Sequence, residues 1–170
     1  MTFKKIAAYS LVGLAALCTA TLALPRHVSV ERAATLDAAP EAIIALAASN
    51  SGYQTFNPYK TLDPNLQIDL FGPTSGVGSG FFFDSKDGTG SQTVAAISPN
   101  QVTYAVDLGA MGTPTQSIAA VPADGGTLVT WRIDSDLGFN PVFRVFGMFM
   151  DSMIGPTFEL GLEKLAKAAA

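Results

Sequence analysis

The strongest constraint on the fold is a long helical pattern in the C-terminal part of the chain, residues 141–168. Apolar side chains recur there every three or four residues, which places them along one stripe of an α-helix. A stripe of this length needs a broad apolar surface to lie on, and residues 26–133 predict short strands that could form one. The stripe consists of Val142, Val145, Phe146, Phe149, Met153, Ile154, Phe158, Leu162 and Leu165.

Pro156 lies inside this pattern. Proline has no backbone N–H and its ring disturbs the preceding turn, so we expect the helix to kink or split after Ile154. Gly155 makes such a bend easier. The kink would either fit the helix to a curved sheet or open the side of a cavity beneath it.

The middle of the chain predicts an antiparallel sheet with short helices after its first strand. Residues 26–36 alternate as a half-buried strand, in which Arg32 is the one charged residue on the apolar face. Asp37 and Pro40 then favour a helix over residues 40–48, and a second short helix or turn follows over residues 53–59. The later strands are joined by turns too short for crossover helices, which indicates an α+β fold of about seven strands. These strands are expected at residues 67–71, 81–83, 93–97, 102–108, 115–121 and 127–133.

Residues 1–25 predict a membrane anchor or signal segment, and residues 26–170 form the domain. Lys4 and Lys5 precede residues 6–24, an uncharged run of 19 residues. This is close to the roughly 20 residues that span a bilayer as a transmembrane helix. The two lysines favour a cytoplasmic N-terminus, which would place the domain in the periplasm on the inner membrane of a bacterium. The alternative is cleavage near Ala23 and release into the periplasm.

Charge and residue counts exclude several classes of function. Ten basic residues stand against 14 acidic ones, a net charge of −4, so a nucleic acid is a poor candidate partner. Cys18 is the only cysteine, so neither a disulfide within the chain nor a cysteine-based metal site is possible. His, Asp and Glu residues do not show the spacing of zinc or calcium sites, and we expect no metal and no cofactor. His27 is the only histidine and lies just after the apolar run, where a polar residue at the membrane interface is a simpler interpretation than a general base.

Two other motifs have both a structural and a chemical interpretation. Asp134 and Asp136 could form an acid–base pair, but they more simply end a strand and cap the following helix. Residues 76–80 resemble a phosphate-binding loop in composition. They stand between strands, however, so they are better interpreted as a flexible hairpin that could form one rim of a cavity mouth.

A set of large apolar residues could line a cavity between the sheet and the C-terminal helix. Walls of this kind with few polar groups suit a hydrophobic ligand, although the same residues could simply fill a core. Tyr104 and the indole of Trp131 are the best polar anchors, since each can form a hydrogen bond from an apolar wall. The candidate lining residues are Phe81, Phe83, Tyr104, Val106, Val129, Trp131, Phe146, Met150 and Met153.

Four segments, residues 34–49, 71–80, 125–134 and 148–167, together resemble the START-like helix-grip superfamily, also called SRPBCC, and within it the polyketide cyclase/dehydrase group. The resemblance implies a curved sheet wrapped on a long C-terminal helix, with a cavity for lipids or other hydrophobic molecules. Tyr53, Phe56 and Tyr59 stand where members of the group commonly have tryptophans.

Three functions follow from these observations. We expect a membrane-tethered, non-enzymatic domain that binds a lipid or other hydrophobic small molecule, because no catalytic constellation is visible. The second hypothesis is an enzyme of cyclase or dehydratase type, using Tyr104 with Asp107 or Arg132, although strand alternation directs these two away from Tyr104. The third is an interaction role with a filled core, which a structure without a cavity of roughly 300 Å³ would favour.

Overall fold

The computed structural model describes residues 21–170, and the sheet that it contains is antiparallel throughout. Its seven strands lie in the order β1-β7-β6-β5-β4-β3-β2. Strands β2 to β7 are therefore a meander, and β1 joins it by pairing with β7. The strands are β1 (His27–Leu36), β2 (Gln67–Phe71), β3 (Gly80–Ser85), β4 (Gly88–Ser98), β5 (Gln101–Asp107), β6 (Thr115–Ala123) and β7 (Gly126–Asp136).

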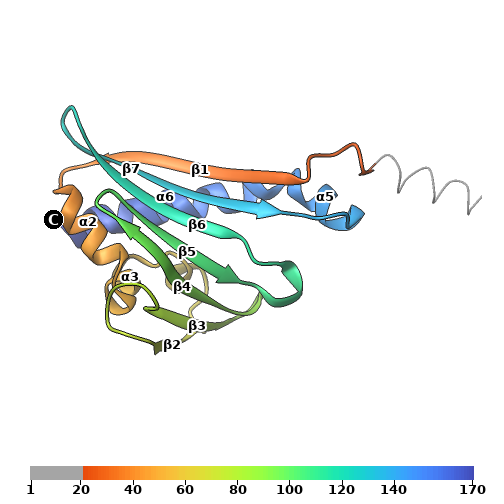
Figure 1. Ribbon diagram of the computed structural model, residues 1–170, viewed down its shortest axis with the longest axis horizontal. Coiled ribbons are helices and arrows are strands. Elements are labelled where there is room, and N and C mark those ends of the chain that lie inside the picture. Colours follow the sequence, from red (N-terminus) through yellow and green to blue (C-terminus); the bar gives the residue numbers. More distant parts are fainter. Residues whose placement is uncertain (1–20) are drawn as a thin grey trace, which may run out of the picture.

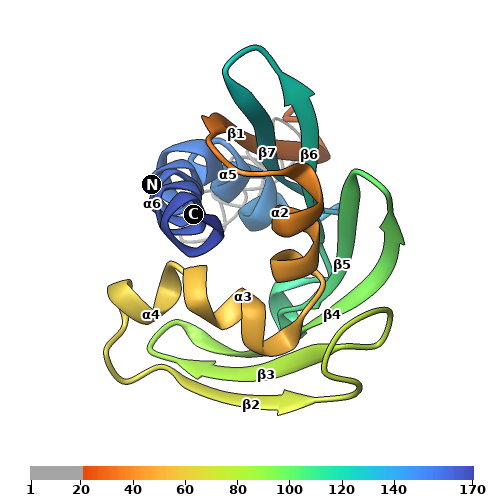
Figure 2. The same cartoon turned by 90° about the vertical axis from the view of Figure 1, so that its left-hand side faces the viewer.

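The sheet curves around the helices, as seen in Figures 1 and 2. Three short helices follow β1: α2 (Pro40–Ala47), α3 (Asn50–Phe56) and α4 (Tyr59–Leu62). Only two were predicted, because the aromatic segment over residues 53–59 was taken as one element. It divides at Asn57 and Pro58, where proline cannot continue the hydrogen bonding of α3. A 3₁₀ turn, η1 (Gly109–Met111), lies between β5 and β6.

The C-terminal pattern forms two helices, α5 (Pro141–Gly147) and α6 (Met150–Ala169). The predicted break after Ile154 is wrong, because α6 continues through Pro156. Pro156 has no N–H to donate to the carbonyl of Ser152, four residues earlier. Both residues are exposed on α6, so water can hydrogen-bond to that carbonyl instead. The chain instead breaks at Met148 and Phe149, directly after Gly147.

Arg32, the one charged residue on the inner face of β1, fastens α6 to the sheet. Its guanidinium donates to Asp151 at 2.8 Å and to Glu159 at 2.8 Å. Gly155 lies between those two carboxylates, and a Cβ on it would come within 1.9 Å of Arg32 Nη2. The glycine therefore makes room for the arginine rather than for a bend.

The core lies where the second half of α6 meets β7 and α3. Trp131 is fully buried and stacks on Phe158, with 5.1 Å between ring centroids. Gly161 sits against the same indole, since a Cβ there would be 2.4 Å from Trp131 Cζ3. Leu162 and Leu165 are buried beside them. This half of the predicted apolar stripe lies on the sheet as expected.

The first half of the predicted apolar stripe does not lie on the sheet. Val142, Val145, Phe146, Phe149 and Met153 are all exposed. They lie on α5, in the break after it and at the start of α6, at the end of the molecule where the described chain begins (Figure 1).

The predicted membrane segment, residues 1–25, falls almost wholly outside the described residues. Within residues 21–170, none of the helices is both long enough and apolar enough to cross a membrane.

Candidate functional site

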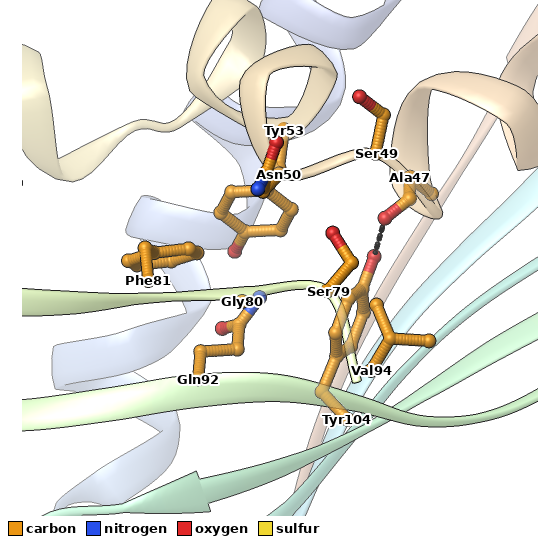
Figure 3. A pocket seen from close by; sticks show the side chains of 10 residues that line it. All are labelled: Ala47, Ser49, Asn50, Tyr53, Ser79, Gly80, Phe81, Gln92, Val94 and Tyr104. Atoms are coloured by element: carbon orange, nitrogen blue, oxygen red, sulfur yellow. Dashed lines mark hydrogen bonds between the residues drawn. The ribbon is translucent and has the colours of Figure 1, made fainter. Parts of the chain in front are cut away.

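The interior between α3 and the strands β3 to β5 contains a small cavity (Figure 3). Its volume is about 10 Å³, roughly the space of a single water molecule. Apolar and polar side chains share its wall. The lining residues are Ala47, Ser49, Asn50, Tyr53, Ser79, Gly80, Phe81, Gln92, Val94 and Tyr104.

Tyr104, one of the two predicted polar anchors, already has a partner inside the protein. Its hydroxyl donates to the carbonyl oxygen of Ala47 at 2.7 Å, at the end of α2. Burial raises the pKa of Tyr104 well above its usual value, so the phenol stays neutral. The hydrogen bond ties β5 to α2 and fixes one side of the cavity.

Tyr53 brings a second phenol into the interior from α3. The N-terminus of this helix is capped by Ser49, whose Oγ accepts from the Gly52 amide at 3.1 Å. Gln116 Nε2 donates to the Tyr53 hydroxyl at 3.2 Å and to Gln92 Oε1 at 3.2 Å. Burial is the main cause that raises the pKa of Tyr53, so this phenol is also neutral. Three separate elements, α3, β4 and β6, therefore contribute to one buried polar cluster.

Part of this interior has hydrogen-bonding capacity that the protein does not use. Ser79 Oγ and Gln92 Nε2, both on the cavity wall, have no hydrogen-bond partner within residues 21–170, and the same is true of Trp131 Nε1. A buried polar atom without a partner costs about 1–3 kcal/mol. Such groups are unusual in a core that serves only to stabilise a fold.

The glycine-rich segment covers one side of this cavity, which lies under α3, whereas the predicted cavity was placed under the C-terminal helix. Ser79 and Gly80 line it directly. The Gly76 amide donates to the Ala48 carbonyl at 3.0 Å, and Asn50 Nδ2 donates to the Phe71 and Pro73 carbonyls at 3.3 Å. Residues 72–80 are thus joined to the start of α3.

The structure brings some of the predicted lining residues together and leaves others outside. Phe81 and Tyr104 line the cavity. Phe83 is half-buried and does not line the cavity, whereas Phe146 and Met153 are 44% and 56% exposed. Phe146 lies outside the interior because the break at Met148 and Phe149 separates α5 from α6, and Met153 lies on the exposed side of the first turn of α6. The remaining predicted residues, Val106, Val129, Trp131 and Met150, are buried in the surrounding core.

Gln92 and Gln116 were missed by the sequence reasoning. Each lies two residues before a buried aliphatic residue of the same strand, Val94 or Ile118, and so shares its face. The strand predicted at residues 93–97 began after Gln92 and so left it out. Gln116 was inside the strand predicted at residues 115–121, but it was passed over as a polar residue near the strand end.

The acidic candidates lie on the outside of the sheet. Arg26 donates to Asp136 at 2.6 Å, and Arg132 donates to Asp134 at 2.6 Å. These hydrogen bonds lower the pKa of both carboxyl groups, which therefore remain ionised. Neither caps α5, because that role belongs to Asn140, whose side chain accepts from the Val142 amide.

The remaining enzymatic candidates are also exposed. Asp107 accepts from the Gly109 amide at 2.8 Å, and Arg132 is engaged with Asp134. Both point away from the interior, as strand alternation predicted. The interior itself offers neutral hydroxyl and amide groups, which suit binding better than proton transfer.

Comparison with known families and structures gives a consistent result. A family model described as polyketide cyclase / dehydrase and lipid transport matches residues 27–170. No match was found among curated protein sequences.

Similar solved structures include the di-domain ARO/CYC protein StfQ of the steffimycin biosynthetic pathway, with 12% identity and a TM-score of 0.62. The alignment covers 84% of this chain and 50% of StfQ, so the chain spans half of that protein. A norcoclaurine synthase of Thalictrum flavum has 11% identity and a TM-score of 0.63, with 84% and 94% covered. The Aha1 protein of Colwellia psychrerythraea has 16% identity and a TM-score of 0.57, with 84% and 96% covered. These likenesses confirm the curved sheet and C-terminal helix of the predicted helix-grip fold.

Proposed function

Because the chain belongs to the family of polyketide cyclase / dehydrase and lipid transport proteins, we propose that its domain binds a lipid or other hydrophobic small molecule between α3 and the sheet. The observation that carries the proposal is the unused hydrogen-bonding capacity of Ser79 Oγ and Gln92 Nε2 in a largely apolar wall. A ligand with an apolar body and one hydroxyl or carbonyl group would match this combination.

Binding requires the interior to open. Ligand sites usually have volumes of roughly 300–1,000 Å³, far above the volume of this cavity. The segment best suited to move is α3 with residues 72–80, because α3 has only seven residues and Asn50 joins the two. A ligand would then stabilise an open conformation that is rarely populated without it.

The closed interior also favours a second candidate, an interaction domain whose core is simply filled. An enzyme of cyclase or dehydratase type is a further alternative, in which Tyr53 would act as a hydrogen-bond donor to substrate. Either alternative predicts a different outcome from the experiment below.

We further propose that residues 6–24 tether the domain to the bacterial inner membrane, with the domain in the periplasm. The support is their length and lack of charge, together with Lys4 and Lys5 before them. Flotation of the full-length chain with membranes after carbonate extraction tests the tether separately from ligand binding.

The test of ligand binding uses full-length protein exchanged into nanodiscs of one synthetic phosphatidylcholine. Solvent extraction and mass spectrometry should recover a retained molecule other than that lipid. Titration with cis-parinaric acid should show saturable binding, weakened about five- to tenfold in Gln92→Leu because one hydrogen bond is lost. Gln101→Leu, which changes an exposed glutamine on the next strand, should bind like the wild type.

Absence of both a retained molecule and parinaric acid binding would contradict the proposal and favour the filled-core alternative. Conversion of the bound molecule to a new product on incubation would favour an enzyme.

A further inference from the structure

Helix α5 has the opposite of the usual arrangement for a surface helix. Its single charged residue, Arg144, is only 6% exposed, whereas Val142 is 69% exposed. A surface helix ordinarily directs its apolar residues to the core and its charged residues to water. The outer face of α5 is therefore built for surroundings other than water.

Arg144 points inward because its guanidinium binds backbone carbonyl groups. Its Nη1 donates to the carbonyl oxygens of Leu22 at 2.6 Å and Leu24 at 3.1 Å, and its Nε donates to Gly138 at 2.9 Å. These bonds hold the end of the uncharged run, residues 6–24, against α5. The point at which that run enters the domain is thus fixed beside the exposed apolar residues.

These residues form a surface that we call the apolar platform. It comprises Phe139, Val142, Phe146, Met148, Phe149 and Met153, all exposed and all on or beside α5 and the first turn of α6. Soluble proteins rarely expose so many large apolar side chains in one short segment, unless that segment binds a partner or a membrane.

The charges around the platform are paired inside the protein, so none of them opposes contact with a bilayer. The guanidinium groups of Arg26 and Arg144 lie 5.2 and 5.7 Å from the ring centre of Phe139. The nearby carboxylates are engaged, Asp136 with Arg26 and Asp151 with Arg32. A short segment with Phe, Val and Met on its outer face and its charges satisfied on the inner side suits the interface of a bilayer, which takes up the apolar side chains.

We propose that the apolar platform inserts into the membrane interface beside the point where residues 6–24 enter the bilayer. This inference rests on the proposed membrane tether. A bilayer is a better occupant than residues 6–20 folded back over the platform, because that run is uncharged on every side. If residues 6–20 covered the platform, the opposite side of that apolar run would face water. A bilayer surrounds the run on all sides.

The test measures the depth of single labelled positions in the full-length chain. In a Cys18→Ser background, Phe146→Cys and Val77→Cys each carry the fluorophore NBD. Val77 is an exposed apolar control, 62% against 44% for Phe146, in the glycine-rich segment joined to α2 and α3 at the other end of the molecule. The proteins are reconstituted into vesicles of phosphatidylcholine and phosphatidylglycerol, with or without brominated acyl chains.

We expect brominated lipid to quench the label at position 146 and shift its emission to the blue, with no quenching at position 77. Chains that float with the vesicles but show no quenching at position 146 would overturn the platform proposal while the tether stands. Chains that do not float at all would refute the tether itself. A blue-shifted but unquenched label at position 146 would show that protein covers the platform, and cross-linking between copies would separate a second chain from residues 6–20.

Discussion

The two ends of the C-terminal helical segment carry the same apolar spacing but lie in opposite surroundings. At the far end, Phe158, Leu162 and Leu165 are buried against Trp131 and its neighbours. At the near end, Val142 and Phe149 have the same character but face outward. The difference shows that apolar periodicity identifies a surface that leaves water, without identifying what covers it.

The largest effect should separate two phenylalanines of this segment. Phe158→Ala removes a fully buried ring stacked on Trp131 and should lower the free energy of unfolding by about 3–5 kcal/mol. Phe149→Ala removes an exposed ring and should change it by less than about 0.5 kcal/mol. Urea titration of the full-length chain, followed by the fluorescence of Trp131, the only tryptophan, gives both values. Equal losses in the two variants would mean that both ends are packed alike.

A smaller contrast lies between two glycines of α6. Gly161→Ala would push a methyl group into the buried indole of Trp131 and should destabilise the fold by about 1–3 kcal/mol. Gly155→Ala meets only the end of the flexible Arg32 side chain, so it should cost less. Both variants gain about 1 kcal/mol of helix propensity, so the difference between their stabilities reflects the contact of the added methyl group alone. The same urea titration measures the difference, and a larger loss in Gly155→Ala would contradict this account.

The smallest effect concerns the arginine that joins α6 to β1. The hydrogen bonds from Arg32 lower the pKa of Asp151 in the folded state. The resulting stabilisation is fully present above the unfolded pKa of about 4 and disappears as the pH falls through the lower folded value. Asp151→Asn should therefore be less stable than wild type at neutral pH and equal to it in strong acid. A difference between the two proteins that does not change with pH would exclude the ion pair as its cause.

Much of the fold could be predicted because strands and turns have local signals. Alternation placed Val129, Trp131 and Ile133 on one buried face, and the short turns fixed the antiparallel meander. Arg32 was noticed as a charged residue on the wrong face, but its partners on α6 lie more than a hundred positions away in the sequence.

The candidate site was less accessible to sequence reasoning. The cluster of Tyr53, Gln92 and Gln116 joins three elements that are distant in the chain, and each residue alone looks ordinary. The helix break after Gly147 lacks the proline that would announce it, and the attention given to Pro156 misplaced it.

Oxidation of the native methionines in the full-length chain, reconstituted into vesicles and treated with hydrogen peroxide, tests the contrast between the two ends most directly. Sulfoxide formation follows access to the solvent, and Met148, Met153 and Met111 are all exposed in the folded domain, whereas Met150 is buried. If the near end is covered by the bilayer, Met148 and Met153 will oxidise slowly, like Met150, while Met111 on its turn between β5 and β6 oxidises fast. Oxidation of Met148 and Met153 at the rate of Met111 would show that this end faces water and would contradict the account.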